Sequence, residues 1–342
     1  MRACVHPTLS FWQFSHEGEF LCLSYAQPNN LCLIMRPGEL GERYVGCQVV
    51  MVTPFRNDFS LDEEGIRHLT NFLIKGGVQV LQPCGSIGEF WSLTPEEHKR
   101  VIKVVVDEAD GRIPVVPGTA HSGTKLTVAL SKYAEEVGAD GVMIVPPYYE
   151  VPTLDGIYEH YKTVAAAIKI GIVIYNNPFT SKITIREELI ERLATIPNIV
   201  AVKDTTADMW LSLKMLRRFG DRFTFSMGSG ESLAAGYYLA GGKGHVSSFA
   251  NFAPTLPVAL YKAAKDRDWE KVKEIDAKMA PFFELRRKLS TKHQGTVSIT
   301  LTKEACRMLG LPGFPPRKPL LPLEEDERQE LRVVLAKMGI LR

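Results

Sequence analysis

The chain has 342 residues, of which 45% are hydrophobic and 23% are charged. This is the composition of a globular protein, and the length allows one large α/β domain or two smaller ones. The formal net charge is only +2, so we expect no nucleic-acid partner and no anionic membrane surface as a partner. No apolar run approaches the roughly 18–20 residues that a membrane-spanning helix needs.

The first 44 residues differ from the rest of the chain. They show no clear helical or strand periodicity, and they lack the basic-then-apolar order of a signal peptide. We therefore expect residues 1–44 to be a poorly ordered extension that is unrelated to the chemistry. Met35 is a possible start, which would place residues 1–34 outside the native protein.

From residue 45 onward, short runs rich in β-branched residues alternate with amphipathic segments. Their spacing is that of successive βα units. Runs that are apolar on both faces, each followed by a helix, predict a parallel sheet covered by helices. Eight such units favour a closed (β/α)8 TIM barrel over an open doubly wound sheet. The predicted strands are residues 45–52, 78–83, 113–118, 141–146, 171–176, 198–203, 223–228 and 244–249.

Helix boundaries are marked between these strands, and the strand pattern stops near residue 268. Three residue pairs fit the capping box of a helix N-terminus: Ser60 with Glu63, Thr94 with Glu97, and Thr184 with Glu187. We expect a barrel domain over 45–267 and a small helical subdomain over 268–342. The predicted helices of this subdomain are 268–287, 300–309 and 324–338. The first of them mixes charged and apolar positions, as an oligomer contact or a solvated face would.

The cysteines and histidines indicate neither disulfides nor a metal. No CxxC pair occurs, so the cysteines are predicted to be reduced thiols of a cytoplasmic protein. They are Cys4, Cys22, Cys32, Cys47, Cys84 and Cys306. His98, His121 and His245 lack the spacing of a metal site, and we expect none.

A lysine ends one of the predicted buried strands, in the stretch IVAVKDTT at 199–206. Alternate residues of a barrel strand point inward, so Ile199, Ala201 and Lys203 share the inner face. Lys203 then projects into the mouth at the C-terminal end of the barrel, where barrel enzymes keep their active sites. The alternative is a lysine that reaches solvent or pairs with Asp204.

Tyr175 holds the matching position at the end of the preceding strand, GIVIYN. Neighbouring strands lie about 4.8 Å apart, so Tyr175 and Lys203 can meet across the mouth. A lysine in an apolar pocket loses part of its charged form and becomes an amine nucleophile that forms a Schiff base with a ketone. The tyrosine hydroxyl can then transfer protons, although an aromatic residue whose hydroxyl meets water is the simpler alternative.

The third candidate element is the loop CGSIGEF at 84–90, directly after the second predicted strand. Gly85 and Gly88 allow a tight turn whose backbone N–H groups converge, and such a nest binds a carboxylate. Ser86 adds a hydroxyl group. An ordinary βα turn would have a similar sequence, but this one lies at the same barrel mouth as Lys203.

Together these motifs resemble the dihydrodipicolinate synthase and N-acetylneuraminate lyase family. The stretches that match are GSIGEFWSLTPEEHKRV, GADGVMIVPPYY, IYNNP and VAVKDTT, and the resemblance covers about residues 45–342. It implies class I chemistry, in which a lysine forms a Schiff base with pyruvate or a larger 2-oxo acid. It also implies that no cofactor is needed beyond the covalent imine on Lys203.

The resemblance assigns a role to four residues. Lys203 corresponds to the Schiff-base lysine and Tyr175 to the proton-transferring tyrosine. Ser86, with Gly85 and Gly88 beside it, corresponds to the loop that holds the carboxylate of the 2-oxo acid. Tyr149 corresponds to a tyrosine that reaches a neighbouring subunit's site, which implies a homo-oligomer, either a dimer or a tetramer.

Departures from the family pattern concern the substrate. Ile87 replaces a second hydroxyl residue of the loop, which removes a hydrogen bond. Thr180 stands where dihydrodipicolinate synthases have an arginine that grips the second substrate's carboxylate, and Lys182 is near but not matching. The acidic residue of the lysine-feedback site falls at Leu126. These changes count against activity in lysine biosynthesis.

Other positions match the sialic-acid-lyase branch in part. Gly228, Glu231 and Ser248 stand where that branch contacts the hydroxyl groups of a sugar acid, and Gly230 replaces its acidic residue. Glu231 could equally be a carboxylate at a helix start.

Three hypotheses follow. The first is a Schiff-base lyase, either an aldolase or a dehydratase, that acts on a 2-keto-3-deoxy sugar acid or a 4-hydroxy-2-oxo acid. The second is 4-hydroxy-tetrahydrodipicolinate synthase, which condenses pyruvate with aspartate semialdehyde. The third is a non-catalytic relative that binds 2-oxo acids. The presence of Lys203, Tyr175 and Ser86 counts against the third.

Overall fold

The chain divides into two units, residues 1–34 and 35–342, in a computed structural model. In the first unit, β1 (Trp12–Phe14) pairs antiparallel with β2 (Phe20–Cys22). The remainder of residues 1–34 lies outside the described residues. The prediction that this extension is poorly ordered falls on those residues and stays a prediction. The structure describes residues 12–14, 20–22, 35–293, 295 and 297–341.

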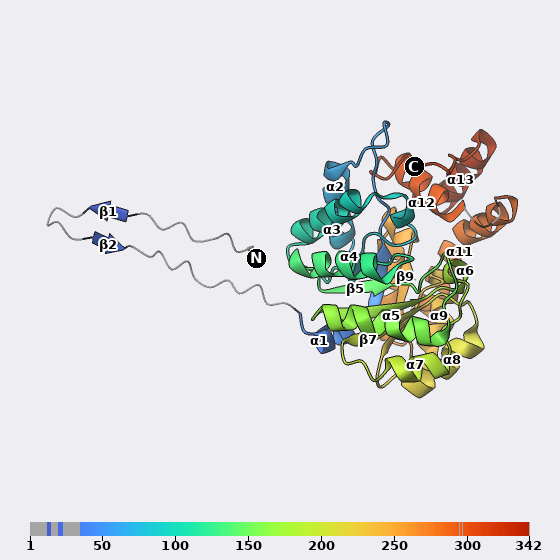
Figure 1. Cartoon of the computed structure of the whole chain (residues 1–342). Coiled ribbons are helices and arrows are strands. Elements are labelled where there is room, and N and C mark those ends of the chain that lie inside the picture. The colour runs from blue at the N-terminus through green and yellow to red at the C-terminus, as the bar shows by residue number, and fades with distance from the viewer. Residues whose placement is uncertain (1–11, 15–19, 23–34, 294, 296, 342) are drawn as a thin grey trace. The chain divides into compact units, whose positions relative to one another are not determined.

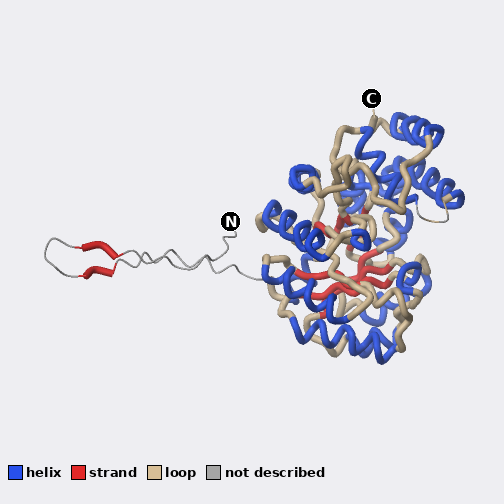
Figure 2. Tube along the Cα trace, turned by 45° about the horizontal axis from the view of Figure 1, so that its top comes forward, coloured by secondary structure: helices blue, strands red, loops and turns tan. Residues whose placement is uncertain are grey.

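The second unit is built on a parallel sheet whose strands lie in its middle, with helices around them (Figures 1 and 2). The strand order is β4-β3-β9-β8-β7-β6-β5. All of these strands are fully buried, which explains why their sequences are apolar on both faces. The strands are β3 (Gly46–Val50), β4 (Val80–Gln82), β5 (Gly141–Ile144), β6 (Gly171–Asn176), β7 (Ile199–Asp204), β8 (Thr224–Met227) and β9 (Gly244–Ser247).

The third predicted strand closes the barrel without forming a regular strand. It runs between β4 and β5 and forms a parallel bridge to each of them. The amide of Val116 donates to the carbonyl of Leu81 at 2.8 Å, and the amide of Met143 donates to the carbonyl of Pro117 at 2.8 Å. Pro114 and Pro117 have no N–H group, so a continuous ladder cannot form here. The predicted (β/α)8 barrel is confirmed, with this segment in the place of its third strand.

Helices cover the outside of the barrel, and a C-terminal group of helices follows it. The barrel helices are α2 (Glu63–Lys75), α3 (Pro95–Ala109), α4 (Thr124–Glu136), α5 (Leu154–Ala167), α6 (Pro178–Ser181), α7 (Glu187–Leu193), α8 (Met209–Phe219), α9 (Glu231–Leu239) and α10 (Thr255–Lys265). The C-terminal helices are α11 (Trp269–Lys292), α12 (Val297–Met308) and α13 (Glu325–Lys337). No helix among the described residues is both long and apolar enough to cross a membrane.

One of the three predicted capping boxes is present. Thr94 caps α3 and accepts a hydrogen bond from the amide of Glu97. The prediction for Ser60 is wrong, because Asp62 caps α2 instead. The prediction for Thr184 is also wrong, since α7 begins after Arg186 without a side-chain cap. An Asp side chain accepts hydrogen bonds from the first free amides of a helix as well as a Ser or Thr side chain does. The sequence therefore offers both Ser60 and Asp62 as the cap of α2.

The end of the predicted extension, residues 35–44, belongs to the second unit. Helix α1 (Pro37–Arg43) packs against the N-terminal ends of β6 and β7, and Leu40 is completely buried there. Gly141 and Gly171 begin β5 and β6, and a Cβ atom on either would lie within 2.7 Å of the Leu40 Cδ2 atom. Glycine at these two positions therefore makes room for Leu40 below the barrel.

Candidate active site

A cavity of about 680 Å³ opens at the C-terminal ends of the strands, between the barrel and α11. It brings together Lys203 of β7, Tyr175 of β6 and Ser86 of the loop after β4. Ile87, Gly228 and Ser248 of the predicted substrate-binding set also line it. The remaining predicted residues, Gly85, Gly88, Tyr149, Thr180 and Glu231, do not line this cavity.

Lys203 and Tyr175 are direct partners in the parallel register of β6 and β7. The Lys203 Nζ atom lies 3.9 Å from the centroid of the Tyr175 ring and 3.6 Å from the Met143 Sδ atom. Lys203 is only 1% exposed. Its amine is therefore surrounded by an aromatic ring and a thioether, which solvate an ammonium ion far less well than water does.

Burial lowers the pKa of Lys203, and Tyr175 partly offsets that shift. Loss of hydration disfavours the charged form of an amine, so the neutral and nucleophilic form becomes more accessible than in water. A lysine beside a ketone needs this form to begin imine formation. The environment of Lys203 thus fits a nucleophile.

The alternative reading, in which Lys203 pairs with Asp204, does not match the structure. The Asp204 side chain accepts hydrogen bonds from the Ser212 hydroxyl and from the Thr206 amide, which lies 3.1 Å away. Neighbouring residues of a strand point to opposite faces, so Asp204 turns toward α8 while Lys203 turns into the barrel. Lys203 also does not reach solvent.

The Tyr175 hydroxyl belongs to a short polar chain that leads away from Lys203. It accepts a hydrogen bond from the Asn177 Nδ2 atom at 3.1 Å, and the same atom donates to the Thr180 hydroxyl at 2.9 Å. Thr180 therefore acts on the site only through Asn177. Asn177 was not predicted from the sequence, although it lies next to the tyrosine strand in the quoted stretch IYNNP.

The loop at 84–90 needs its glycines for close packing. A Cβ atom on Gly88 would lie 2.9 Å from the Met51 carbonyl oxygen, and one on Gly85 would lie 2.6 Å from a Val50 methyl group. The left-handed backbone positions belong instead to Cys84 and Glu89, with φ of 56° and 54°. The loop turns tightly as predicted, but steric crowding rather than a positive φ selects glycine here.

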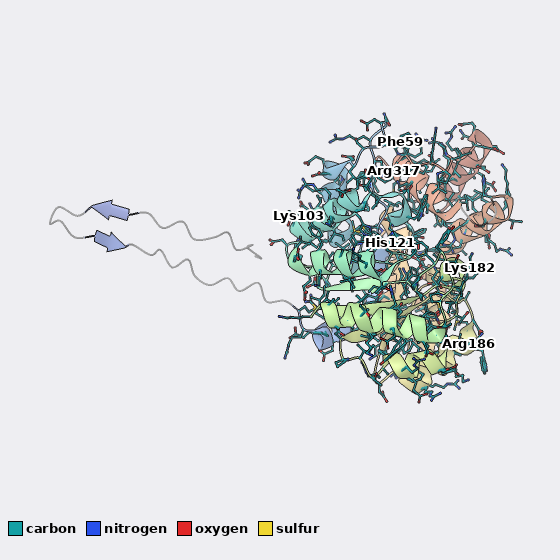
Figure 3. The ribbon with its side chains drawn as sticks, viewed as in Figure 1. Phe59, Lys103, His121, Lys182, Arg186 and Arg317 are labelled. Atoms are coloured by element: carbon teal, nitrogen blue, oxygen red, sulfur yellow. The ribbon has the colours of Figure 1, made fainter. Side chains whose placement is uncertain are left out.

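The C-terminal subdomain holds the end of this loop through a buried ion pair. Glu89 and Lys303 are both fully buried, and their Oε1 and Nζ atoms lie 2.5 Å apart. The amide of Arg317 donates to the other carboxylate oxygen of Glu89 at 2.8 Å, and its guanidinium donates to the carbonyl of Phe59. Figure 3 shows Arg317 near Phe59 on the same side of the barrel as the C-terminal helices. Lys303 was not predicted from the sequence, because nothing in its helix marks a buried lysine.

Two predicted residues lie away from the reacting groups. Glu231 is buried, accepts a hydrogen bond from the Ser247 hydroxyl, and leaves its Oε2 atom without a hydrogen-bond partner among the described residues. Burial raises the pKa of its carboxyl group. Tyr149 is 84% exposed and stands outside the cavity.

Helix α11 contributes a wall of the cavity that the sequence did not predict. Asp276, Ala280, Phe283, Arg287 and Ser290 recur at helical spacing and line the cavity from one face of α11. The sequence predicts an oligomer contact or a solvated face for this helix, because it mixes charged and apolar positions. Part of that polar character belongs to the cavity.

The whole barrel and its C-terminal helices match known proteins. The family model of the Dihydrodipicolinate synthetase family matches residues 43–338. A 4-hydroxy-tetrahydrodipicolinate synthase from Methanopyrus kandleri is 35% identical, and the match covers 88% of this chain and 99% of that protein. The crystal structure of a dihydrodipicolinate synthase from Aquifex aeolicus has a TM-score of 0.81 at 34% identity, covering 86% of this chain and 98% of the other.

A third comparison bears on the ligand of a relative. The dihydrodipicolinate synthase of Acinetobacter baumannii was solved in complex with pyruvate, and it has a TM-score of 0.80 at 31% identity, covering 87% of this chain and 99% of that one. Similarity at this level extends over sheet, loops and C-terminal helices alike. The chain therefore belongs to the dihydrodipicolinate synthetase family, and it is an enzyme of the class I, Schiff-base-forming lyase type.

Proposed function

We propose that this enzyme forms an imine between Lys203 and a 2-oxo acid, and that it acts as an aldolase or dehydratase on a substrate with a hydroxylated tail. A 2-keto-3-deoxy sugar acid or a 4-hydroxy-2-oxo acid fits this description. The observation that supports the proposal most directly is the Lys203 amine, buried against Tyr175 at the floor of a cavity large enough for such a molecule.

The proposed reaction begins with the neutral Lys203 amine. Its nitrogen attacks C2 of the 2-oxo acid, and the ketone oxygen leaves as water, which gives an iminium ion. The loop at 85–88, with Ser86, holds the substrate carboxylate during this step. We propose that the reaction needs no cofactor, because the iminium itself serves as the electron sink.

Tyr175 moves the proton in the second half of the reaction. In cleavage, the C4 hydroxyl loses its proton, the C3–C4 bond breaks, and its electrons form an enamine with the iminium. In dehydration, a C3 proton is removed and the C4 hydroxyl leaves as water. Protonation and hydrolysis of the nitrogen adduct then release the product and free Lys203.

The lining of the cavity supports a hydroxylated tail. Besides Ser86, the hydroxyl groups of six residues line it, and each can donate or accept a hydrogen bond. They are Thr205, Ser229, Ser232, Ser248, Ser290 and Ser298. In addition, Thr180 accepts a hydrogen bond from Asn177 and does not line the cavity, so the arginine clamp of dihydrodipicolinate synthases has no equivalent at that position.

The second candidate function is the condensation of pyruvate with aspartate semialdehyde. It is supported by the relatives themselves, since those at about 35% identity bear the name 4-hydroxy-tetrahydrodipicolinate synthase. This candidate requires carboxylate binding from a residue other than Thr180. Activity assays in both directions separate it from sugar-acid cleavage.

We also propose that the enzyme works as a homo-oligomer, a dimer or a tetramer. Tyr149 and Val151 are 84% and 55% exposed, and Leu154 follows them at 37%. Apolar side chains that gather in one exposed segment favour a contact with another chain. We propose that Tyr149 reaches the active site of a neighbouring subunit, as the resemblance implies.

A borohydride trap tests the central proposal. The protein is incubated with pyruvate and reduced, and its intact and peptide masses are measured. We expect a pyruvate-derived adduct on the peptide that contains Lys203 and none in Lys203→Ala. If no 2-oxo acid in a small panel gives an adduct, the lyase proposal fails and the non-catalytic alternative takes its place.

A further inference from the structure

The two arginines of α11 differ from every other cation on that helix. All five lysines of α11 form ion pairs with glutamates: Lys271, Lys273, Lys278, Lys288 and Lys292. Arg286 and Arg287 instead line the cavity, and neither side chain forms an ion pair or hydrogen bond within the described part of the chain. The helix therefore directs two unpaired guanidinium groups at the space above Lys203.

The Arg286 side chain is positioned by a contact with an aromatic ring. Its guanidinium carbon lies 4.9 Å from the centroid of the Phe283 ring, and Phe283 lines the same cavity. Stacking on an aromatic face leaves the N–H edges of a guanidinium available for a planar acceptor. A carboxylate, which has the matching two-oxygen geometry, is the acceptor that such an edge binds best.

No carboxylate of the described residues forms an ion pair or hydrogen bond with the Arg286 guanidinium. Burial lowers the pKa of Arg286, and only the nearby Glu231 opposes that shift. Glu231 is itself buried and accepts a hydrogen bond from the Ser247 hydroxyl, and it forms no ion pair with Arg286 within the described residues. A half-buried guanidinium without a full counter-charge is stabilised when an anion binds.

Two acidic residues share this wall of the cavity and shape what can bind. Asp276 and Glu284 line it beside the arginines. Their carboxylates can accept hydrogen bonds from hydroxyl or ammonium groups, and they repel an anion of high charge. The combination favours a ligand with a single carboxylate flanked by hydrogen-bond donors over a phosphate.

We propose that Arg286, assisted by Arg287, binds a second carboxylate at the end of the substrate remote from its 2-oxo acid group. This inference rests on the proposed function, because it places the 2-oxo acid end at Lys203. It assigns to α11 the task that the arginine after the tyrosine strand would perform. It narrows the substrate to a dicarboxylic compound, or to a pair of reactants of which one is an acidic aldehyde.

Matched pairs of 2-oxo acids test this directly on the unaltered enzyme. 2-Oxoglutarate and 2-oxopentanoate have the same chain length and differ in a terminal carboxylate against a methyl group, as do 2-oxoadipate and 2-oxohexanoate. Half-saturation of the borohydride-trapped adduct is measured for each acid and for pyruvate. We expect the dicarboxylic member of at least one pair to trap at about tenfold lower concentration, as a charged hydrogen bond implies.

Variants assign the preference to its residue. Arg286→Met should reduce the ratio within the preferred pair to near one while the half-saturation for pyruvate stays the same, and Arg287→Met should reduce it in part. Lys182→Met and Lys273→Met remove the same charge from exposed positions outside the cavity and should keep the full ratio. If Arg286→Met does not fold, Arg287→Met and the comparison on the unaltered enzyme still decide the question.

The outcomes separate this inference from the proposed function. Absence of an adduct with pyruvate and with all four longer 2-oxo acids would refute the Schiff-base proposal itself. A pyruvate adduct with no dicarboxylate preference in either pair would refute only the α11 site. If the preference for the dicarboxylic acid survives in both arginine variants, the α11 site is also refuted. If that preference is lost in Lys182→Met instead, the second carboxylate binds at Lys182.

Discussion

Lys203 and Tyr175 stand opposite each other in the ladder of β7 and β6, with the amine 3.9 Å from the centre of the phenol ring. The pairing has two opposing effects. The ring stabilises the ammonium form through its electron-rich face, whereas burial removes the water that would stabilise it far more. The net effect is a lowered pKa for Lys203, so the fold holds this amine in a place where its charged form is disfavoured.

The first prediction concerns the free-energy cost of burying the charged Lys203 amine. Lys203→Met should be more stable than the unaltered protein at pH 7, because the substitution removes the cost of burying a charged amine. The penalty on Lys203 is fully present below its folded-state pKa. It disappears as pH rises toward 10.5, because the unfolded state then also loses its proton. The difference between the two proteins should therefore shrink with rising pH.

Urea unfolding at pH 7 and at pH 10 measures this difference. Lys182→Met serves as the control, because Lys182 is exposed and its removal should change stability little at either pH. Equal stability of Lys203→Met and the unaltered protein at both pH values would show that the buried amine is not destabilising.

The second prediction separates the two members of the pair. Tyr175→Phe keeps the ring over Lys203 and removes only the hydroxyl, so the pyruvate adduct should still form. Turnover of the true substrate should fall by about 10²–10⁴-fold, the usual contribution of a positioned proton-transfer group. Asn177→Ala, which removes the hydrogen bond to that hydroxyl, should give a smaller loss. Unchanged turnover in Tyr175→Phe would exclude the tyrosine from proton transfer.

The arrangement of this pair could be predicted from the sequence because strand geometry is local. A period of two places Lys203 on the inner face, and parallel strands of equal length place Tyr175 beside it. The same reasoning produced the closed barrel. It wrongly predicted a regular third strand. Pro114 and Pro117 can be seen in the sequence, but the effect of their missing N–H groups depends on how the neighbouring strands pair.

The parts that escaped prediction depend on contacts between distant segments. Lys303 meets Glu89 across more than half of the chain, and nothing near either residue in sequence announces the other. Arg286 and Arg287 lie on a helix with little amphipathic character, so the face that lines the cavity could not be told from a solvated face. The capping error at Ser60 has the opposite cause, since the neighbouring Asp62 met the same local rule, whereas α7 begins after Arg186 with no side-chain cap at all.

The third prediction concerns the loop that should hold the substrate carboxylate. Gly88→Ala places a methyl group 2.9 Å from the Met51 carbonyl oxygen, so the loop must shift. Pyruvate should then trap only at concentrations raised by about tenfold or more, because a shifted nest loses charged hydrogen bonds. Gly123→Ala, where nothing nearer than 3.9 Å meets the added atom, is the matched control. An unaltered trapping curve for Gly88→Ala would mean that the carboxylate binds elsewhere.

The fourth prediction concerns the buried ion pair between the barrel and its C-terminal helices. Lys303→Met leaves Glu89 buried without its partner, which should lower the free energy of unfolding by about 3–5 kcal/mol. Burial lowers the pKa of Lys303 to about 8, even though Glu89 raises it. Lys288→Met removes an exposed ion pair on α11 and should cost less than about 1 kcal/mol.

Denaturant unfolding of both variants, followed by intrinsic fluorescence, measures the contrast. The double variant Lys303→Met with Glu89→Gln should recover part of the loss, because it removes the unpaired charge. If the double variant is no more stable than Lys303→Met alone, the cost lies in packing rather than in the buried charge.

The last prediction concerns Tyr149, which no group of its own subunit buries. If Tyr149 serves a neighbouring active site, Tyr149→Phe should lose turnover although Lys203 and Tyr175 are intact. Lys203→Ala should be inactive on its own, but it still offers an intact Tyr149 to its neighbour. Mixed oligomers of the two variants, made by unfolding and refolding them together, should therefore regain activity, because some sites receive Lys203 from one subunit and Tyr149 from the other.

Each variant refolded alone provides the baseline, and light scattering establishes that mixed particles are dimers or tetramers. Mixtures that are no more active than the average of the two baselines would show that Tyr149 does not act across a subunit boundary.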